Sequence, residues 1–188
     1  MKYNKESAQM SRPAAWVAGW LVVLVGALPV AAAAETAPLA GAGAVGNWRF
    51  GNGPEFKGAT GALAQSGEGI ALHYDFTAGG AYVEALWGGA ALPAELSAIR
   101  LTVSADSESE LKFRVIAGER CFQGAAQHLA KGKPTVVTIS IAGPWPQVWG
   151  GEKIPAPTGP LSKFAVLATK HGSPSGTVTI SDVQLVTH

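Results

Sequence analysis

The stretch TVVTISI, Thr135–Ile141, alternates in character with a period of two residues, because Val137, Ile139 and Ile141 share one phase. The segment TVTISDVQLV, Thr177–Val186, shows a similar alternation near the end of the chain. Successive side chains of a strand point to opposite faces of a sheet, so this period predicts two strands with one buried face each. Both segments are rich in the β-branched residues that favour extended backbone.

The chain from Asn47 onward consists of similar short runs that Gly and Pro separate, and helical periodicity is almost absent. Together with 135–141 and 177–186, the predicted strands cover residues 47–50, 59–64, 70–76, 81–87, 98–105, 110–116, 120–127 and 163–169. Many short strands without a repeated period or helical crossovers predict an all-β fold. The expected architecture is a two-sheet antiparallel β-sandwich of the jelly-roll kind, and a single closed barrel is the alternative.

The first 34 residues differ from this pattern. Lys2, Lys5 and Arg12 form a basic start, an apolar run covers residues 14–30, and four alanines end at Ala34. This arrangement predicts a secretory signal peptide that is cleaved after Ala34, with an uncleaved membrane anchor as the alternative. The expected location of the mature protein is therefore secreted or periplasmic.

The remaining part of the chain divides into a short leader and one domain. Residues 35–46 are rich in Ala, Gly and Pro and predict a flexible leader, so the β-sandwich domain is expected at 47–188. Without residues 1–34 the chain keeps 11 of its 14 basic and 12 of its 13 acidic residues, a net charge near −1. This balance argues against a nucleic-acid partner and against an anionic membrane surface.

The stretch LHYDFTAGGAYVEALW, Leu72–Trp87, contains the first candidate site. If 70–76 and 81–87 form a hairpin, one face is apolar and belongs to the core, and the other face gathers the polar residues. That polar set consists of His73, Asp75, Tyr82 and Glu84.

Three interpretations of this polar face remain open at this point. Its residues are solvated side chains of a half-buried sheet, or a surface that binds a ligand, or an acid/base pair formed by Asp75 and Glu84. A ring such as Tyr82 beside hydrogen-bonding groups suits sugars, whose C–H faces stack on aromatic rings. An open sheet face does not perturb a carboxyl pKa in the way that catalysis needs, so the third interpretation is the weakest.

Five segments, taken in order, resemble a known family: WRFGNGPEFKGATGALAQ, LHYDFTAGGAYVEALW, LKFRVIAGERCFQ, WGG and SGTVTISDVQLV. They are similar to the galactose-binding-like jelly-roll modules beside catalytic domains in bacterial secreted glycoside hydrolases, especially carbohydrate-binding modules of the family 11 type. The resemblance covers about residues 46–187. It implies a polysaccharide or oligosaccharide partner, a glycoside hydrolase as a companion, and no catalytic activity of its own.

The resemblance also implies where a glycan would bind, namely the concave outer face of one sheet or the loops at one end. On the sheet it implies Tyr82 and Glu84, which alternate outward in GGAYVEA. The inward phase of the apolar residues in ELKFRVI leaves Arg114 pointing outward, and the motif RCFQ contributes Gln123.

Two tryptophans in the segment GPWPQVWGG are further candidates. Trp145 and Trp149 lie in a Gly-rich loop that prolines stiffen, which suits a preformed platform for stacking on a sugar ring. The alternative is that one of the two rings caps the edge of the core.

A structural calcium is also implied, because jelly-roll modules of this kind often hold one between the N-terminal loop and the last strand. Glu55 and Asp182 match the positions expected for a ligand pair, and backbone carbonyls would supply the other oxygens.

The leading hypothesis is therefore an exported, non-catalytic module that binds carbohydrate. The second is a periplasmic structural or assembly protein that uses the same sandwich for protein contacts, which an extended apolar patch would favour. The third is a component of a glycoside hydrolase built on Asp75 and Glu84.

Overall fold

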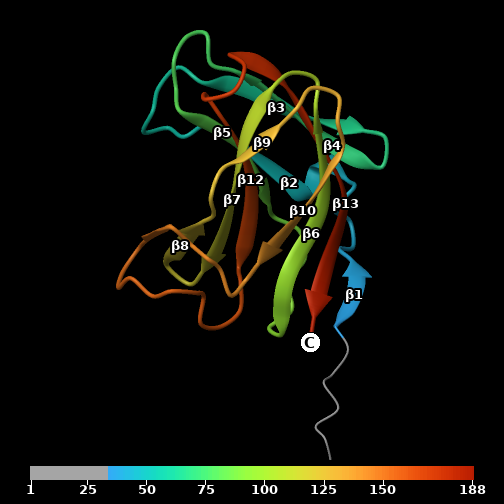
Figure 1. Cartoon of the computed structure of the whole chain (residues 1–188), viewed down its shortest axis with the longest axis vertical. Helices are drawn as coiled ribbons and strands as arrows, with labels where there is room; N and C mark the ends of the chain where they lie inside the picture. Colours follow the sequence, from blue (N-terminus) through green and yellow to red (C-terminus); the bar gives the residue numbers. More distant parts are fainter. Residues whose placement is uncertain (1–33) are drawn as a thin grey trace, which may run out of the picture. The chain divides into compact units, whose positions relative to one another are not determined.

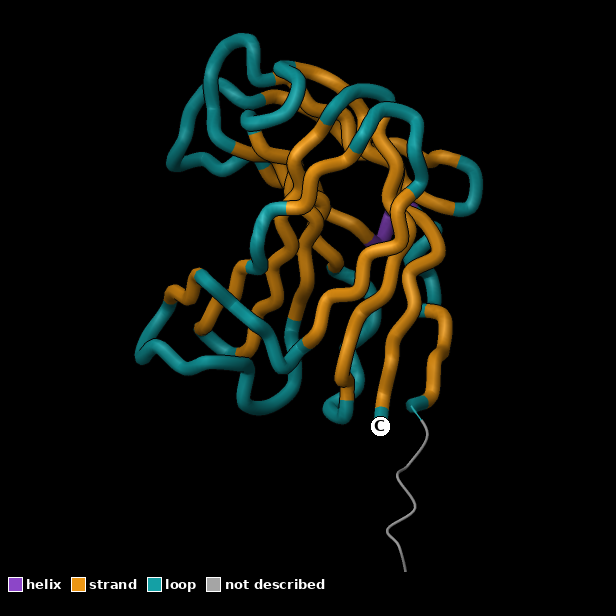
Figure 2. Tube along the Cα trace, viewed as in Figure 1, coloured by secondary structure: helices purple, strands orange, loops and turns teal. Residues whose placement is uncertain are grey.

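Strands dominate residues 34–188, the part of the chain that the computed structural model describes (Figure 1). Helix in this part is limited to one 3-10 turn, η1 (Val45–Asn47), as Figure 2 shows. None of the helices described here is long and apolar enough to cross a membrane. The predicted signal peptide falls, apart from Ala34, outside the described residues.

Two antiparallel sheets form a sandwich, which confirms the predicted fold class and excludes the single closed barrel. Sheet A has six strands, of which five follow one another in a row and β1 pairs beside them with β13. In spatial order they are β10 (Thr135–Ser140), β6 (Leu96–Ala105), β13 (Ser175–Thr187), β4 (Gly69–Asp75) and β3 (Thr60–Ser66), with β1 (Glu35–Pro38) on β13.

Sheet B has seven strands, six in a row and β9 paired beside them with β7. The order is β11 (Gln147–Trp149), β8 (Arg120–Gln123), β7 (Ser109–Ala117), β12 (Lys163–Thr169), β5 (Tyr82–Trp87) and β2 (Trp48–Gly51), with β9 (Gln127–Leu129) on β7. The central strand β12 lies between β7 and β5, so its residues are the least able to reach water from the sheet edges.

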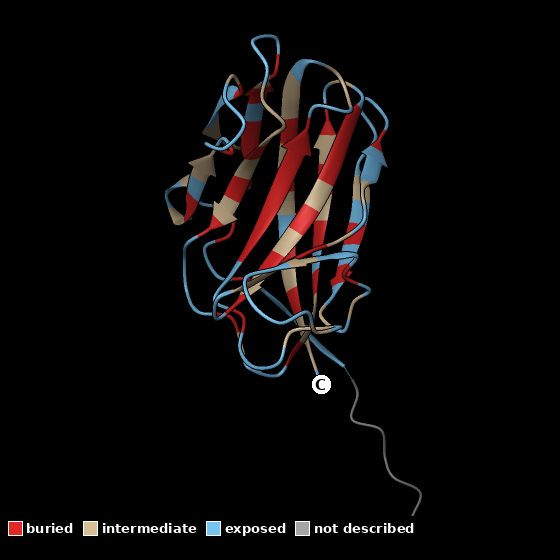
Figure 3. Ribbon diagram, turned by 90° about the vertical axis from the view of Figure 1, so that its left-hand side faces the viewer, coloured by how far each residue is buried: buried red, intermediate tan, exposed pale blue. Residues whose placement is uncertain are grey.

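The core lies between the sheets, where alternate side chains of both meet. Figure 3 shows the buried residues along the strands and most exposed residues in the loops. Three aromatic side chains form its largest cluster: the ring of Trp48 lies 5.4 Å from that of Trp87 and 5.3 Å from that of Phe164. Both indole N–H groups donate to backbone carbonyls, so no buried donor is left without a partner there.

The segment predicted as a flexible leader contains an ordered strand instead. β1 pairs with the second half of β13, where β4 no longer runs beside it, and the N–H of Leu39 donates to the carbonyl of Val183 at 2.8 Å. Leu39 and Ala42 are buried in the core. No alternation of apolar and polar residues reveals this strand, because all four of its residues are exposed and its role is to pair the backbone edge of β13.

The predicted hairpin between 70–76 and 81–87 is wrong, although the phase of each strand is right. β4 pairs with β3 and β13 in sheet A, while β5 pairs with β2 and β12 in sheet B. The link between them crosses from one sheet to the other, and Gly80 lies so close to Ala59 there that an added Cβ would come within 2.4 Å of the Ala59 Cβ. Inward residues of both strands reach the same core from opposite sides. The phase of each strand therefore cannot distinguish a hairpin in one sheet from two strands in different sheets.

This topology separates Asp75 from Glu84 and overturns the acid/base hypothesis. Asp75 lies in sheet A, where its carboxylate accepts hydrogen bonds from the backbone and the hydroxyl of Thr77. Glu84 lies on the outer face of sheet B. The two carboxylates belong to opposite outer faces of the sandwich and cannot flank one substrate bond.

The aromatic cluster gives a test of the core. Phe164 is fully buried, so the change Phe164→Ala is expected to lower the free energy of unfolding by about 3–5 kcal/mol through lost contacts and a cavity. The control Val136→Ala removes a side chain that is 54% exposed and should cost less than about 1 kcal/mol. Denaturant unfolding measures both, and equal losses in the two variants would contradict this packing.

Candidate functional site

The outer face of sheet B is unusual because its central strand is buried on this side as well. Ala165 and Leu167 of β12 share the outward phase with Arg114 and Lys112, which lie directly opposite them on β7. Both β12 residues are nevertheless only 1% exposed. Side chains from the neighbouring strands therefore form a layer above β12, and that layer contains most of the predicted site.

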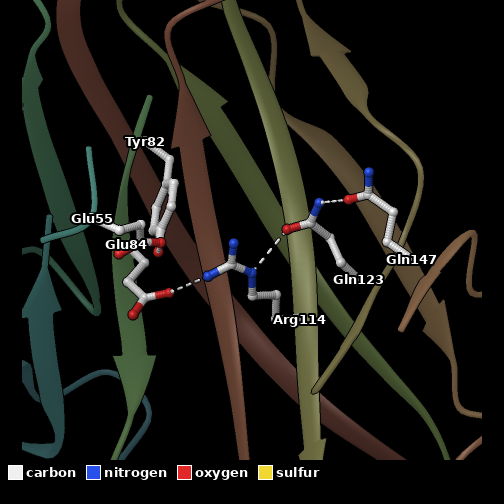
Figure 4. A network of polar contacts seen from close by, with 6 residues as sticks. All are labelled: Glu55, Tyr82, Glu84, Arg114, Gln123 and Gln147. Atoms are coloured by element: carbon white, nitrogen blue, oxygen red, sulfur yellow. Dashed lines mark hydrogen bonds and ion pairs between the residues drawn. The ribbon is translucent and has the colours of Figure 1, made fainter. Parts of the chain in front are cut away.

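Arg114 is the centre of this layer (Figure 4). Its Nε donates a hydrogen bond to Oε1 of Gln123 at 2.8 Å, and its Nη1 lies 3.3 Å from Oε2 of Glu84 in an ion pair. The amide nitrogen of Gln123 in turn donates to the side-chain oxygen of Gln147. Figure 4 shows these four side chains in one line across the sheet, from β5 to β11.

Two aromatic rings flank the guanidinium group. Its central carbon lies 4.5 Å from the ring centroid of Tyr82 and 5.4 Å from that of Trp149. Both distances are within the range of cation–π attraction, which strengthens where water is excluded. Arg114 is thus held by an ion pair, a hydrogen bond and two rings, and this combination fixes the orientation of a long side chain that would otherwise be mobile.

The loop before β3 supports Tyr82 from the other side. The hydroxyl of Tyr82 donates to Oε1 of Glu55 at 2.8 Å, and the ring of Phe56 meets the Tyr82 ring edge-on at 6.3 Å. Gly53 has a φ of 56°, and a Cβ at this position would come within 2.8 Å of the Tyr82 ring. Only glycine fits both the backbone turn and the close approach to the ring.

The electrostatics of the layer follow from burial and from these partners. Burial raises the pKa of Glu84, and the nearby Arg114 charge offsets this only in part. Burial also raises the pKa of the Tyr82 hydroxyl. Hydrogen bonds from its own backbone N–H and from Tyr82 lower the pKa of Glu55, which is exposed at the rim. Both carboxylates are therefore occupied by protein partners rather than directed at a substrate.

A depression of about 200 Å³ lies over this layer. Trp149 and Phe56, which are 44% and 50% exposed, form parts of its wall. Its other lining residues include Tyr82, Lys112, Arg114, Gln123, Gln147, Leu167 and His171. The floor is thus polar and fixed, while two aromatic side chains offer exposed apolar surface.

The structure brings together five of the six residues predicted for binding. Tyr82, Glu84, Arg114 and Gln123 lie in one network on the predicted outer face, and Trp149 adjoins it. Gln123 is buried, with 5% exposure, so it positions Arg114 more than it presents itself to solvent.

Trp145 does not belong to this group, and its prediction as an exposed platform is corrected. Its side chain is only 8% exposed, and its ring packs edge-on against the buried Phe122 at 6.0 Å. The indole N–H donates to the carbonyl of Ile141 at 2.9 Å. Of the two tryptophans in the loop, Trp145 is the one that caps the core.

The predicted calcium ligands do not form a common site. Glu55 engages Tyr82 beside sheet B, whereas Asp182 lies in a bulge of β13 in sheet A and accepts a hydrogen bond from Gln184. Across residues 34–188, no group of three or more His, Cys, Asp and Glu side chains is placed to hold a metal ion. Glu55 and Asp182 are therefore not the ligand pair that the resemblance implied, and calcium binding itself stays a prediction.

Gln147 and Phe56 are site residues that the sequence interpretation missed. Gln147 and Trp149 alternate with Val148 in a short strand, β11, that was interpreted as loop because Pro and Gly surround it. The sequence does contain a signal for the buried outer side of β12. The run from Phe164 to Ala168 is continuously apolar, and a strand that is buried on both faces loses its alternation.

Comparisons with known proteins concern the fold alone. No protein-family model matches the sequence, and neither does any curated protein. The family 11 carbohydrate-binding module from Clostridium thermocellum, solved with a β-1,3-1,4-mixed-linked tetrasaccharide, gives a TM-score of 0.55 at 13% identity, covering 80% of this chain and 94% of that module. A mutant family 29 module gives 0.51 at 10% identity, covering 82% and 92%. The chain has the jelly-roll fold of these carbohydrate-binding modules.

A third solved structure extends this likeness to part of an enzyme chain. An agarase matches this chain with a TM-score of 0.54 at 12% identity, over 81% of this chain and 24% of the agarase chain. At these identities the likeness establishes the fold and not the ligand. The predicted resemblance to modules of the family 11 type is confirmed at that level.

The ion pair between Arg114 and Glu84 at the centre of the layer over β12 can be tested by titration. In the intact protein we expect the pKa of Glu84 to lie above its ordinary value of 4.5, and in Arg114→Met to rise further because the neighbouring charge is lost. Carboxyl NMR titration measures both, and Arg49→Met, which removes an exposed arginine of β2, is the control. An unchanged Glu84 pKa in Arg114→Met would contradict the pairing.

The raised pKa of Glu84 also determines how this residue makes the folding stability depend on pH. A carboxyl whose pKa is higher in the folded state favours folding at low pH, and this contribution is lost as pH rises through the folded pKa. The stability of Glu84→Gln minus that of the native protein should therefore increase as the pH rises from below the ordinary carboxyl pKa of 4.5 to neutral, as denaturant unfolding at each pH would show.

Proposed function

We propose that this chain is a non-catalytic carbohydrate-binding module whose ligand lies in the depression over Arg114. One observation carries the proposal: Arg114 is held rigidly between two aromatic rings, and one of them, Trp149, stays 44% exposed beside it. The fold shared with known carbohydrate-binding modules supports the same function.

The chemistry of the depression suits a sugar. The exposed ring of Trp149 can stack on the C–H face of a pyranose, while Arg114 and Gln147 present hydrogen-bonding groups in fixed positions. Because the network already orders these side chains, little conformational entropy remains to be lost on binding. Glu84 contributes by positioning Arg114, not by contacting the ligand.

The arrangement of carboxylates supports a binding role without catalysis. Glycoside cleavage needs two carboxyl groups that flank the scissile bond. Here Glu84 is paired with Arg114, Glu55 is bonded to Tyr82, and neither lines the depression. The proposal accordingly assigns binding alone to this chain.

Export and a glycoside-hydrolase companion are further parts of the proposal. The predicted signal peptide at 1–34 would deliver the module to the periplasm or the medium, where polysaccharides are found. Occurrence of the same fold within an agarase chain is compatible with a role that accompanies an enzyme.

Protein contact through an extended apolar surface is the less favoured alternative. Only three large hydrophobic side chains are exposed in residues 34–188, namely Phe56, Val136 and Trp149. Phe56 and Trp149 both line the depression, while Val136 lies on β10 of the other sheet. This distribution fits a small aromatic and polar site better than an apolar patch.

Removal of the exposed ring tests the proposed function. Trp149→Ala is expected to weaken glycan binding about tenfold, which corresponds to about 1.4 kcal/mol of lost stacking. Affinity electrophoresis against neutral and acidic polysaccharides would find the ligand, and titration calorimetry would then give the dissociation constants. Val136→Ala is the control on the other sheet and should bind as the native protein does. Equal affinities of native protein and Trp149→Ala would exclude this site.

A further inference from the structure

The depression over Arg114 adjoins two others that share lining residues with it. A larger one, of about 510 Å³, shares Gln147 and Trp149 with it and extends to Lys153. Another, of about 380 Å³, shares His171 with it and extends to His128. Shared lining residues make the three depressions neighbours along one path, whose central part is lined by residues of β11, β8, β7, β12 and β5.

The charged side chains that line the first two depressions are basic. They are Lys153 in the first and Lys112 and Arg114 in the second, while the third adds the imidazoles of His128 and His171, of which His128 lies 3.8 Å from Glu110. Glu108, at the far end, is the one carboxylate among the lining residues of the three. Glu55 lies at the rim of the central depression, where the Tyr82 hydroxyl occupies it.

The other carboxylates of this face are withdrawn below its surface. Glu84 lies against Arg114 with its side chain 20% exposed. Glu110 is buried, and its Oε1 accepts a hydrogen bond from the hydroxyl of Thr169 at 2.7 Å. Glu84 and Glu110 are thus engaged by protein partners and withdrawn from solvent.

Two of these cations have no anionic partner within residues 34–188. Neither Lys112 nor Lys153 forms an ion pair there, although Lys112 is half-buried in the floor of the path beside Leu167. A half-buried ammonium group is desolvated in part, and an anion of the ligand would offset that cost. Arg114, in contrast, already has its carboxylate.

We propose that the ligand is a linear acidic glycan, with carboxylate or sulfate groups, that lies along this path. The proposal rests on the proposed carbohydrate-binding function and adds the charge class of the ligand. Trp149 holds a sugar ring near the centre, and Lys112 and Lys153 bind the anionic groups.

Matched polysaccharide pairs test this charge class. Polygalacturonate against its methyl ester tests carboxylates, and dextran sulfate against dextran tests sulfates, because each pair keeps one backbone and differs in charge. Affinity electrophoresis and calorimetry on the protein should give at least about tenfold tighter binding of one acidic form than of its neutral counterpart, and rising salt should weaken it. Carboxylate and sulfate ligands are distinguished by which pair shows the difference.

Charge-removal variants locate the effect. Lys112→Gln and Lys153→Gln should each weaken binding of the acidic glycan about three- to tenfold more than they weaken binding of its neutral counterpart. Arg100→Gln removes an exposed positive charge from sheet A and is the matched control. Equal losses in Arg100→Gln and the lysine variants would mean non-specific attraction and would overturn the proposal. Melting temperatures close to that of the native protein would show that the variants are folded.

The possible failures are distinguishable. Binding of neutral polysaccharides with no preference for acidic ones would overturn the acidic-glycan proposal and leave the carbohydrate-binding function standing. Absence of binding to every neutral and acidic polysaccharide would overturn both.

Discussion

The outer face of sheet B depends on one constraint. The positively charged guanidinium group of Arg114 lies above β12, a strand that is buried on both faces. Ala165 of β12 lies directly opposite Arg114 and is almost fully buried, so the guanidinium group lies in surroundings that water reaches poorly. A charge there needs partners. The ion pair with Glu84, the hydrogen bond to Gln123 and the rings of Tyr82 and Trp149 supply them from three other strands. Sheet B is thereby joined across its outer face by side chains as well as by backbone.

Strand phase was predictable from the sequence, and strand partners were not. Alternation correctly assigned Tyr82, Glu84 and Arg114 to an outer face, because the period of two follows from the pleat alone. It could not tell that β4 and β5 belong to different sheets, since the inward residues of both enter one core. The acid/base interpretation of Asp75 with Glu84 failed for this reason, although each residue had been assigned correctly to the outside of its strand.

The two tryptophans of one loop show a second limit of prediction from the sequence, which concerns the burial of single side chains. Trp145 and Trp149 have similar neighbours in the sequence, yet the first is buried against Phe122 and the second is half exposed beside Arg114. Pairing of β11 with β8 decides this, because it turns Val148 inward and Trp149 outward. That pairing is a long-range event, and nothing in the local composition encodes it. The same limit concealed β1, whose contribution is backbone pairing with β13.

Preorganisation connects this architecture with the proposed function. The side chains of the layer over β12 are held by their own contacts, and under the proposed function a sugar would meet groups that are already ordered. The most direct measurement is an NMR titration of the isotope-labelled protein with the tightest-binding oligosaccharide of a polysaccharide panel. The account predicts amide shift changes along β5, β7, β8 and β11 and at the indole N–H of Trp149, with sheet A unaffected. Changes confined to sheet A, or to loops away from Arg114, would contradict it.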